Sequence, residues 1–252
     1  MGIEKHVLRD AKVAIVYRGH YYRTGDKTSN AFNCFDNHIE NIHQHIHNKD
    51  IYFHTYTGVD DTKLINMIKP SQYIIQSRPP EVIKKLNSTS YSSRVNTFIQ
   101  ANKLFDVSMY EYILNLRFDL QVNTPVYSWP VDILKFNTLH PERTWSNWYE
   151  EYKTSDLLYL YPSRMHDDYI QSVKELHNLE SRVKLRYKGY NRRETKPIGW
   201  THWLTKHMEP KIGLNNIHIM YPEPYYSGGT PEDPSHVQTH NPNVHINRKQ
   251  QN

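Results

Sequence analysis

A charged pair near the middle of the chain offers the clearest chemistry in the sequence. Arg117 and Asp119 are two residues apart in YEYILNLRFDL (residues 110–120), an apolar run that predicts a buried strand. At this spacing we expect both side chains on one face of the strand, at its carboxyl end. Opposite charges buried there are costly unless they act on a ligand. Asp119 could help to hold a divalent ion against a diphosphate, with Arg117 as a positive contact. An ordinary ion pair that ends the strand is the alternative.

Alternating strands and helices are predicted to position this pair. The strands cover residues 12–17, 51–55, 71–76 and 110–120. The helices between them cover residues 31–47, 60–68 and 92–104. This alternation predicts an α/β fold, in which helices cover a parallel sheet. Ligands bind at the carboxyl ends of the strands in such sheets, so the residues that follow each strand are the first candidates for a site.

The second half of the chain has a different texture. Strands are predicted over residues 157–161 and 217–220, and helices over residues 169–183 and 199–208. From residue 221 onward Pro, Gly, Asn and His dominate, and such a segment buries too little apolar area to offset the entropy of ordering it. We therefore expect one domain over residues 1–220 and a surface-bound or disordered tail over residues 221–252.

Composition narrows the class of protein. The 252 residues carry a net charge of +5, which favours anionic partners without proving nucleic-acid binding. Cys34 is the one cysteine, which excludes an internal disulfide and a cysteine-based zinc cluster. The chain has no dinucleotide, P-loop, hydrolase-elbow or zinc-peptidase motif. No apolar run approaches the ~18 residues of a membrane span, and we expect a soluble, cytoplasmic protein.

Three segments carry a family resemblance. KVAIVYRGHYYR (residues 12–23), DIYFHTY (50–56) and YEYILNLRFDL (110–120) follow one another with helices between them. Together they resemble glycosyltransferases of bacteria and of large DNA viruses, including algal viruses, that act on capsid or surface glycans. The resemblance covers about the first 120 residues. It implies a single-domain GT-A-like fold with a mostly parallel central sheet, in which residues 1–122 bind the nucleotide sugar and residues 123–220 bind the acceptor.

The resemblance also implies roles for individual residues. Asp119 matches the Asp-x-Asp metal motif of the family, although Arg117 stands where the first Asp would be. This departure puts a strict metal requirement in doubt, and Mn²⁺ or Mg²⁺ is the implied cofactor. His202 could be a second metal ligand, or an ordinary packed histidine. Contacts to the nucleotide or its diphosphate are implied for Tyr17, Arg18, Gly19, His54, Thr55, Arg94 and Arg117. Arg94 could equally be a solvated residue of its helix.

A general base is the remaining requirement. A sugar transfer with inversion needs a carboxylate that takes the proton of the acceptor hydroxyl. Asp156, in Thr154-Ser155-Asp156, and Asp168 are the candidates. Asp156 could equally be a turn residue, and Asp168 could simply cap the next helix. Whether the transfer inverts or retains the configuration stays open.

Basic and histidine-rich stretches are given simpler interpretations. Six Lys and Arg residues between positions 184 and 196 are either a solvated loop or a clamp over the donor diphosphate. The histidines of the 31–47 helix, His38 and His43 among them, and those of the tail are interpreted as polar surface.

The function implied is transfer of a sugar from a nucleotide-sugar donor to a hydroxyl of an acceptor glycan. UDP is the nucleotide typical of such folds, and xylose is one candidate sugar. A nucleic-acid-binding protein with stacking tyrosines and a carbohydrate-binding protein without catalysis are the alternatives.

Overall fold

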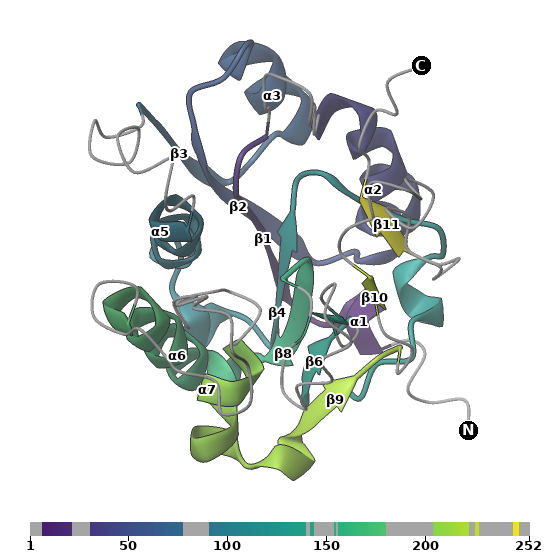
Figure 1. Ribbon diagram of the computed structural model, residues 1–252. Helices are drawn as coiled ribbons and strands as arrows, with labels where there is room; N and C mark the ends of the chain where they lie inside the picture. The colour runs from purple at the N-terminus through teal and green to yellow at the C-terminus, as the bar shows by residue number, and fades with distance from the viewer. Residues whose placement is uncertain are drawn as a thin grey trace, which may run out of the picture.

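The computed structural model describes residues 7–21, 31–77, 91–139, 142–143, 154, 156–179, 204–221, 225–226 and 244–246. Its central strands are β1 (Val13–Arg18), β2 (Lys49–Tyr56), β3 (Gln72–Gln76), β4 (Tyr112–Arg117), β6 (Phe136–Thr138), β8 (Leu158–Pro162) and β9 (Ile217–Ile219). These strands form one seven-stranded sheet in the order β3-β2-β1-β4-β8-β6-β9 (Figure 1). The four strands predicted in the first half of the chain are therefore present.

Strand direction divides the sheet into two parts. From β3 to β4 all neighbours are parallel, with Arg18 of β1 level with both His54 of β2 and Arg117 of β4. The strand β8 is antiparallel to β4 and to β6, and β9 is again parallel to β6. A mostly parallel sheet in a single-domain α/β fold is confirmed.

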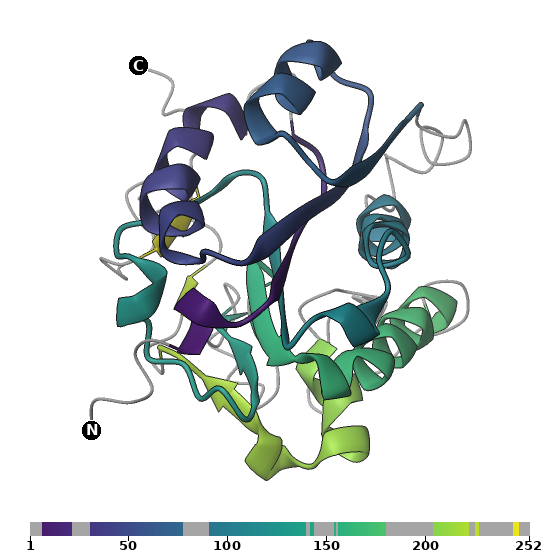
Figure 2. The same cartoon turned by 180° about the vertical axis from the view of Figure 1, so that it is seen from behind.

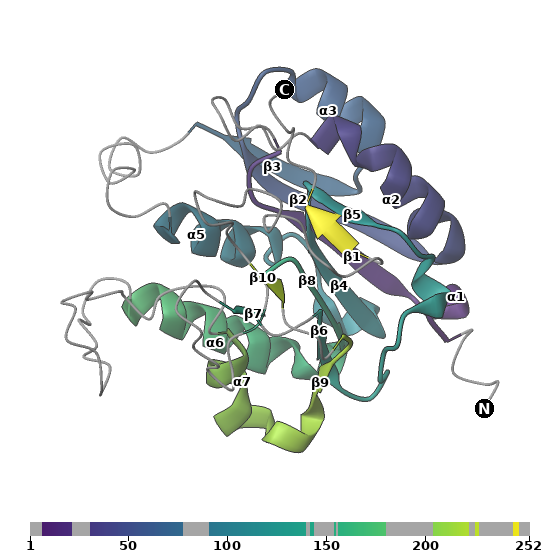
Figure 3. The same cartoon turned by 45° about the vertical axis from the view of Figure 1, so that its right-hand side comes forward.

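Helices cover both faces of the sheet. The helices α2 (Phe35–Asn41) and α3 (Asp61–Ile68) lie on one face. On the other face lie α5 (Tyr91–Ala101), α6 (His166–Leu179) and α7 (Leu204–Ile212). The two layers are clear in the turned view of Figure 3 and again from behind in Figure 2. A short helix, α1 (Val7–Asp10), precedes β1.

Each face of the sheet contributes to its own hydrophobic cluster. Ile15 and Tyr17 of β1 pack in the cluster on the α2–α3 side, whereas Ala14 and Val16 pack in the cluster on the α5–α6 side. This is the two-residue period of a strand that is buried on both faces. The same alternation directs Arg18 toward α5, where its guanidinium lies over the ring of Phe98.

The segment 31–47 is not the single amphipathic helix that was predicted. It consists of a 3₁₀ turn (Ala31–Asn33), α2 and a second 3₁₀ turn (His43–His45). The spacing of Phe35, Ile39 and Ile42 in the sequence predicts that all three lie on one buried helix face. Ile39 is nevertheless 43% exposed, whereas His38 is 1% exposed. The prediction that His38 and His43 belong to a polar surface is therefore wrong. Their ring nitrogens find hydrogen-bond partners in the interior, which offsets the cost of burying them.

The segment after residue 220 contributes two short strands. Tyr225–Tyr226 (β10) pairs with Glu142–Arg143 (β7), and Val244–Ile246 (β11) pairs in antiparallel fashion with Leu120–Val122 (β5). The pairing of β11 with β5 brings residues 244–246 beside the segment that directly follows Asp119, as Figure 3 shows. At these three residues the tail is an ordered part of the fold.

Four buried histidines predict that the fold is sensitive to acid. Burial lowers the pKa of His43 to about 3 and that of His38, His54 and His166 to about 4, below the usual 6.5. Between pH 6.5 and 4 the unfolded chain therefore binds protons that the folded protein does not, so the free energy of unfolding should fall as the pH drops through this range.

We expect the melting temperature to decrease steadily from pH 7 to pH 5. His166→Gln, which removes one of the four groups, should make the pH dependence of the unfolding free energy shallower by about one proton. The measurement is urea unfolding at several pH values. A melting temperature that is constant from pH 7 to pH 5 would show that these histidines are accessible to protons in the folded state.

Candidate functional site

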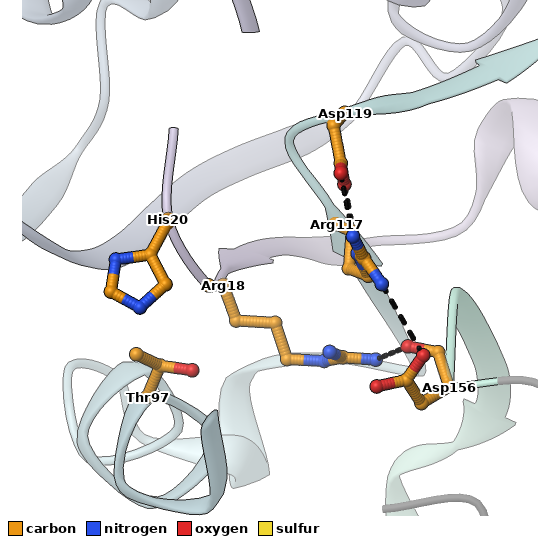
Figure 4. Close-up of a pocket in the computed structure, with 7 residues that line it drawn as sticks. Arg18, His20, Thr97, Arg117, Asp119 and Asp156 are labelled. Atoms are coloured by element: carbon orange, nitrogen blue, oxygen red, sulfur yellow. Dashed lines mark hydrogen bonds and ion pairs between the residues drawn. The ribbon is translucent and has the colours of Figure 1, made fainter. Parts of the chain in front are cut away.

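A pocket opens at the carboxyl ends of β1 and β4. Its volume is about 290 Å³, part of which is open to solvent, and it is lined by Arg18, Gly19, His20, Thr97, Arg117, Asp119 and Asp156 (Figure 4). Five of these seven residues are among those predicted from the sequence. Polar residues that follow parallel strands meet at the carboxyl ends of those strands, and this rule accounts for most of the residues that line the pocket.

Arg117 links the two carboxylates of the pocket. Its Nε donates to Asp119 Oδ1 at 2.8 Å and its Nη2 to Asp119 Oδ2 at 2.5 Å, a bidentate pair. Its Nη1 lies 3.4 Å from Asp156 Oδ1. The side chains of Arg117, Asp119 and Asp156 are 10%, 3% and 4% exposed, and their opposite charges compensate one another in this buried position.

The sequence predicted that Asp119 lies on the same strand as Arg117, but Asp119 lies in the turn that follows the strand. The strand β4 ends at Arg117, Phe118 and Asp119 form a turn, and β5 begins at Leu120. The turn brings the carboxylate of Asp119 back toward the guanidinium two residues earlier. The two residues form an ion pair across this turn, at the carboxyl end of β4.

Asp156 is fixed by contacts with both neighbouring strands. Its carbonyl oxygen accepts a hydrogen bond from Arg18 Nη2 at 2.5 Å. The next residue, Leu157, accepts a hydrogen bond at its carbonyl oxygen from the backbone N–H of Arg117 at 3.0 Å. The backbone of Asp156 therefore keeps its carboxylate in the pocket.

Arg18 is the second cation of the pocket. Its guanidinium carbon lies 3.5 Å from the centre of the Phe98 ring and 5.5 Å from that of Tyr159. Burial lowers its pKa, against the opposing effects of Tyr169, Tyr159 and Asp156. Within the described part of the chain its Nε has no hydrogen-bond partner. A buried donor of this kind is suited to an acceptor atom supplied by a ligand.

Gly19 shapes the turn that follows β1. Its φ of +98° belongs to the left-handed region that favours glycine, and a Cβ built there would meet no atom within 4 Å. The next residue, His20, stacks on Tyr56 of β2 with ring centres 5.2 Å apart. The turn therefore presents backbone to open space beside the two arginines, where a ligand can approach closely.

The donor set is compatible with Mn²⁺ or Mg²⁺ bound through one carboxylate. Among the described residues no three His, Cys, Asp or Glu side chains are close enough together to enclose a metal ion. Mg²⁺, however, usually binds through one or two carboxylates and the phosphates of a substrate. A carboxylate has about four lone-pair sites, so the pairing with Arg117 does not by itself prevent Asp119 from binding a metal ion. His202 lies outside the described residues.

Three of the predicted nucleotide contacts lie away from the pocket. Tyr17 points to the opposite face of the sheet, where its hydroxyl contacts His38 and His43. His54 is fully buried and level with Arg18 but does not line the pocket. Thr55 is also fully buried and accepts a long hydrogen bond, 3.4 Å, from the backbone of Tyr21.

His54 is unusual among the buried groups. Burial lowers its pKa to about 4, which Gln76 opposes only in part. Gln76 is close enough to act on this pKa, but neither ring nitrogen of His54 has a well-formed hydrogen bond within the described part of the chain.

Asp168 lies in the first turn of α6, at the other edge of the sheet. Because β8 is antiparallel to β4, its end at Pro162 lies level with Tyr112, at the amino end of β4. The helix α6 begins four residues later, at His166. Asp168 therefore does not line the pocket, and it lies inside the first turn of α6, where a carboxylate interacts favourably with the helix dipole. Arg94 belongs to α5, and its side chain lies outside the described part of the structure.

The sequence did not single out His20 and Thr97, which also line the pocket. His20 directly follows the predicted Arg18-Gly19 pair, so its position was available from the sequence. Thr97 lies three residues after Arg94 on the predicted helix, and only the packing of α5 against β1 brings it to the site.

The comparisons with known proteins found similar solved structures but no match by sequence. No family model and no curated protein matches the sequence. One similar solved structure is described as a glycosyltransferase involved in the glycosylation of the major capsid of PBCV-1. It is 12% identical, with a TM-score of 0.37, over 92% of this chain and 91% of that chain. A likeness at this level transfers no function.

No helix in the described part of the chain combines the length and the apolar character needed to cross a membrane.

The ion pairs of Arg117 predict a large effect on stability. Arg117→Met removes the cation that contacts both buried carboxylates and should lower the free energy of unfolding by about 3–5 kcal/mol, measured by urea unfolding at pH 7. Adding Asp119→Asn should recover part of this loss because it removes one of the two charges. Arg164→Met, at an exposed arginine, is the control and should cost less than about 0.5 kcal/mol. Equal losses for Arg117→Met and Arg164→Met would contradict the mutual dependence of these charges.

Proposed function

We propose that this protein is a glycosyltransferase that moves a sugar from a UDP-linked donor to a hydroxyl group of an acceptor glycan, with xylose as one candidate sugar. The observation that carries the proposal is a pocket with two buried arginines and two buried carboxylates at the carboxyl edge of a parallel sheet. The arginines suit a diphosphate, and the carboxylates suit a metal ion and a proton acceptor.

Donor binding is expected at the ends of β1 and β4. Arg18 and Arg117 lie level on these adjacent strands and face the same side of the sheet. Guanidinium groups side by side can each donate to oxygens of a diphosphate. The turn at Gly19 leaves open space next to them for the nucleotide. This edge is also where parallel α/β sheets usually bind nucleotides.

The charge of the pocket indicates why a metal ion would help. The charges of Arg18 and Arg117 cancel those of Asp119 and Asp156. A diphosphate would therefore bring uncompensated negative charge into a partly buried site. Mn²⁺ or Mg²⁺ held by Asp119 would offset the charge that develops on the nucleotide diphosphate as it leaves. The basic residues between positions 184 and 196 lie outside the described residues.

Asp156 is proposed as the general base of an inverting transfer. The acceptor oxygen forms a bond to the anomeric carbon while the bond from that carbon to the diphosphate oxygen breaks. The electron pair of the broken bond leaves with UDP, and the acceptor proton passes to Asp156. Its Oδ1 lies 3.4 Å from Arg117 Nη1, so the cation is close enough to stabilise the ionised carboxylate that must accept the proton.

UDP binding with and without Mn²⁺ tests the donor site. We expect calorimetry to show tighter binding of UDP with Mn²⁺ than with EDTA. Asp119→Asn should remove this difference and reduce sugar transfer about a hundredfold, on the order of 3 kcal/mol in the barrier. The control is Asp132→Asn, which breaks a surface ion pair with Lys135 and should change neither result. Turnover of Asp119→Asn within twofold of the wild type would exclude Asp119 from the site.

Wild-type protein that binds single-stranded DNA at raised salt but no UDP would instead favour the nucleic-acid-binding alternative.

The role of Asp156 predicts a separation of binding from transfer. Asp156→Asn keeps an oxygen acceptor for Arg117 but cannot take a proton, so transfer should fall at least a hundredfold while UDP affinity stays within a few-fold of the wild type. Product formation and calorimetry measure the two effects. Asp168→Asn, at the other edge of the sheet, should keep both activities. Full transfer by Asp156→Asn together with loss of transfer in Asp168→Asn would reassign the base to Asp168.

A further inference from the structure

Three buried polar side chains form a hydrogen-bond network next to the turn that contains Asp119. The hydroxyl of Tyr17 lies 3.1 Å from His38 Nδ1 and 2.8 Å from His43 Nε2. His38 Nε2 in turn lies 2.5 Å from the carbonyl oxygen of Leu120. Tyr17, His38 and His43 are at most 7% exposed. This hydrogen-bond network lies on the α2 face of the sheet, opposite the pocket.

The position of each hydrogen in this network follows from which of the contacting atoms can donate and which can only accept. The carbonyl of Leu120 can only accept, so His38 Nε2 carries a hydrogen and donates it. In neutral His38, Nδ1 must then accept the hydrogen of the Tyr17 hydroxyl. The oxygen of Tyr17 remains free to accept from His43 Nε2–H. Burial keeps both histidines neutral near pH 7, because it lowers the pKa of His38 to about 4 and that of His43 to about 3. All donors therefore point toward Leu120.

The hydrogen-bond network contacts both residues that flank Asp119 in the sequence. Leu120 follows Asp119, and its carbonyl is the final acceptor. Phe118 precedes Asp119, and its ring stacks on that of Tyr17 with centres 5.3 Å apart and planes 19° apart. The side chain of Asn37, also on α2, donates to the carbonyl of Val122 at 2.8 Å and accepts from its N–H at 2.9 Å. The backbone is thus fixed from residue 118 to residue 122.

We propose that Tyr17 and His38 are positioning residues for Asp119, which set the direction of its carboxylate toward Arg117 and toward the metal ion and diphosphate. The part that concerns the ligand rests on the proposed function. Neither residue touches the pocket. They act through Phe118 and Leu120, because a turn held at both ends leaves Asp119 little freedom to move away from Arg117.

A matched pair of tyrosine variants separates positioning from ordinary packing. Tyr17→Phe keeps the ring on Phe118 but removes the hydroxyl that orients His38. Tyr52→Phe removes an equally buried hydroxyl on the neighbouring strand, where Tyr52 contacts Tyr110 at 2.5 Å on the α5 face. Tyr17→Phe loses two buried hydrogen bonds and Tyr52→Phe loses one, so both melting temperatures should fall, that of Tyr17→Phe somewhat more. The turn at Asp119 should be affected by the first substitution alone.

Two readouts are proposed. Hydrogen exchange of the backbone over residues 118–122, without ligand, should be at least tenfold faster in Tyr17→Phe and unchanged in Tyr52→Phe. The affinity for UDP in the presence of Mn²⁺ should fall 10- to 100-fold in Tyr17→Phe and stay within twofold in Tyr52→Phe. His38→Gln, whose amide can donate to Leu120 and accept from Tyr17, should retain more affinity than His38→Leu.

The outcomes are distinguishable. The positioning role would be overturned if hydrogen exchange over residues 118–122 had the wild-type rate in Tyr17→Phe. It would also be overturned if Tyr52→Phe accelerated this exchange as much as Tyr17→Phe does. Wild-type protein that binds no UDP with Mn²⁺ would refute the proposed function, and the exchange comparison would still decide whether Tyr17 holds the turn. Faster exchange with unchanged UDP affinity would show that the turn is held but that its position does not matter for the ligand, and would also overturn the proposal.

Discussion

The geometry of the candidate site depends on a single guanidinium. Arg117 compensates Asp119 through two hydrogen bonds and approaches Asp156 with its remaining nitrogen. Three charges with side chains at most 10% exposed cannot be buried separately, because each would lose its hydration without a counterion. The end of β4, the turn after it and the segment before β8 must therefore meet at one place. The pocket exists because this requirement is satisfied at the edge of the sheet, where ligands have access.

The two-residue period of the strands explains which predictions about the site were right. The positions of β1, β2 and β4 were predictable because each is a short, nearly continuous apolar run, as strands buried on both faces require. Arg18 and Arg117 were correctly placed at strand ends. The family resemblance grouped Tyr17 with Arg18 as nucleotide contacts, yet adjacent residues of a strand point to opposite faces. The same rule that predicted the strand therefore excluded Tyr17 from the pocket.

Other features required information that a single sequence does not contain. Nothing local to LYLYP indicates that β8 is antiparallel, and this direction alone places Asp168 at the far edge of the sheet and Asp156 at the near one. Apolar spacing placed Ile39 inside and His38 outside. The actual phase of α2 follows from the hydrogen bonds that Tyr17 and Leu120 offer to His38, and those partners are 21 and 82 residues away. Long-range partners of polar groups overrode the hydrophobic pattern.

Asp119 occupies the point where the two faces of the sheet act on the same short turn. From the α5 face it is attracted by Arg117, a contact that depends on charge and would weaken if the turn shifted. From the α2 face its backbone neighbours are held by neutral groups whose hydrogen bonds and ring contacts do not depend on a ligand. An electrostatic contact alone would let the carboxylate follow any competing cation. Because the backbone is fixed independently, a ligand that reaches Asp119 must fit the position that the buried face has already set.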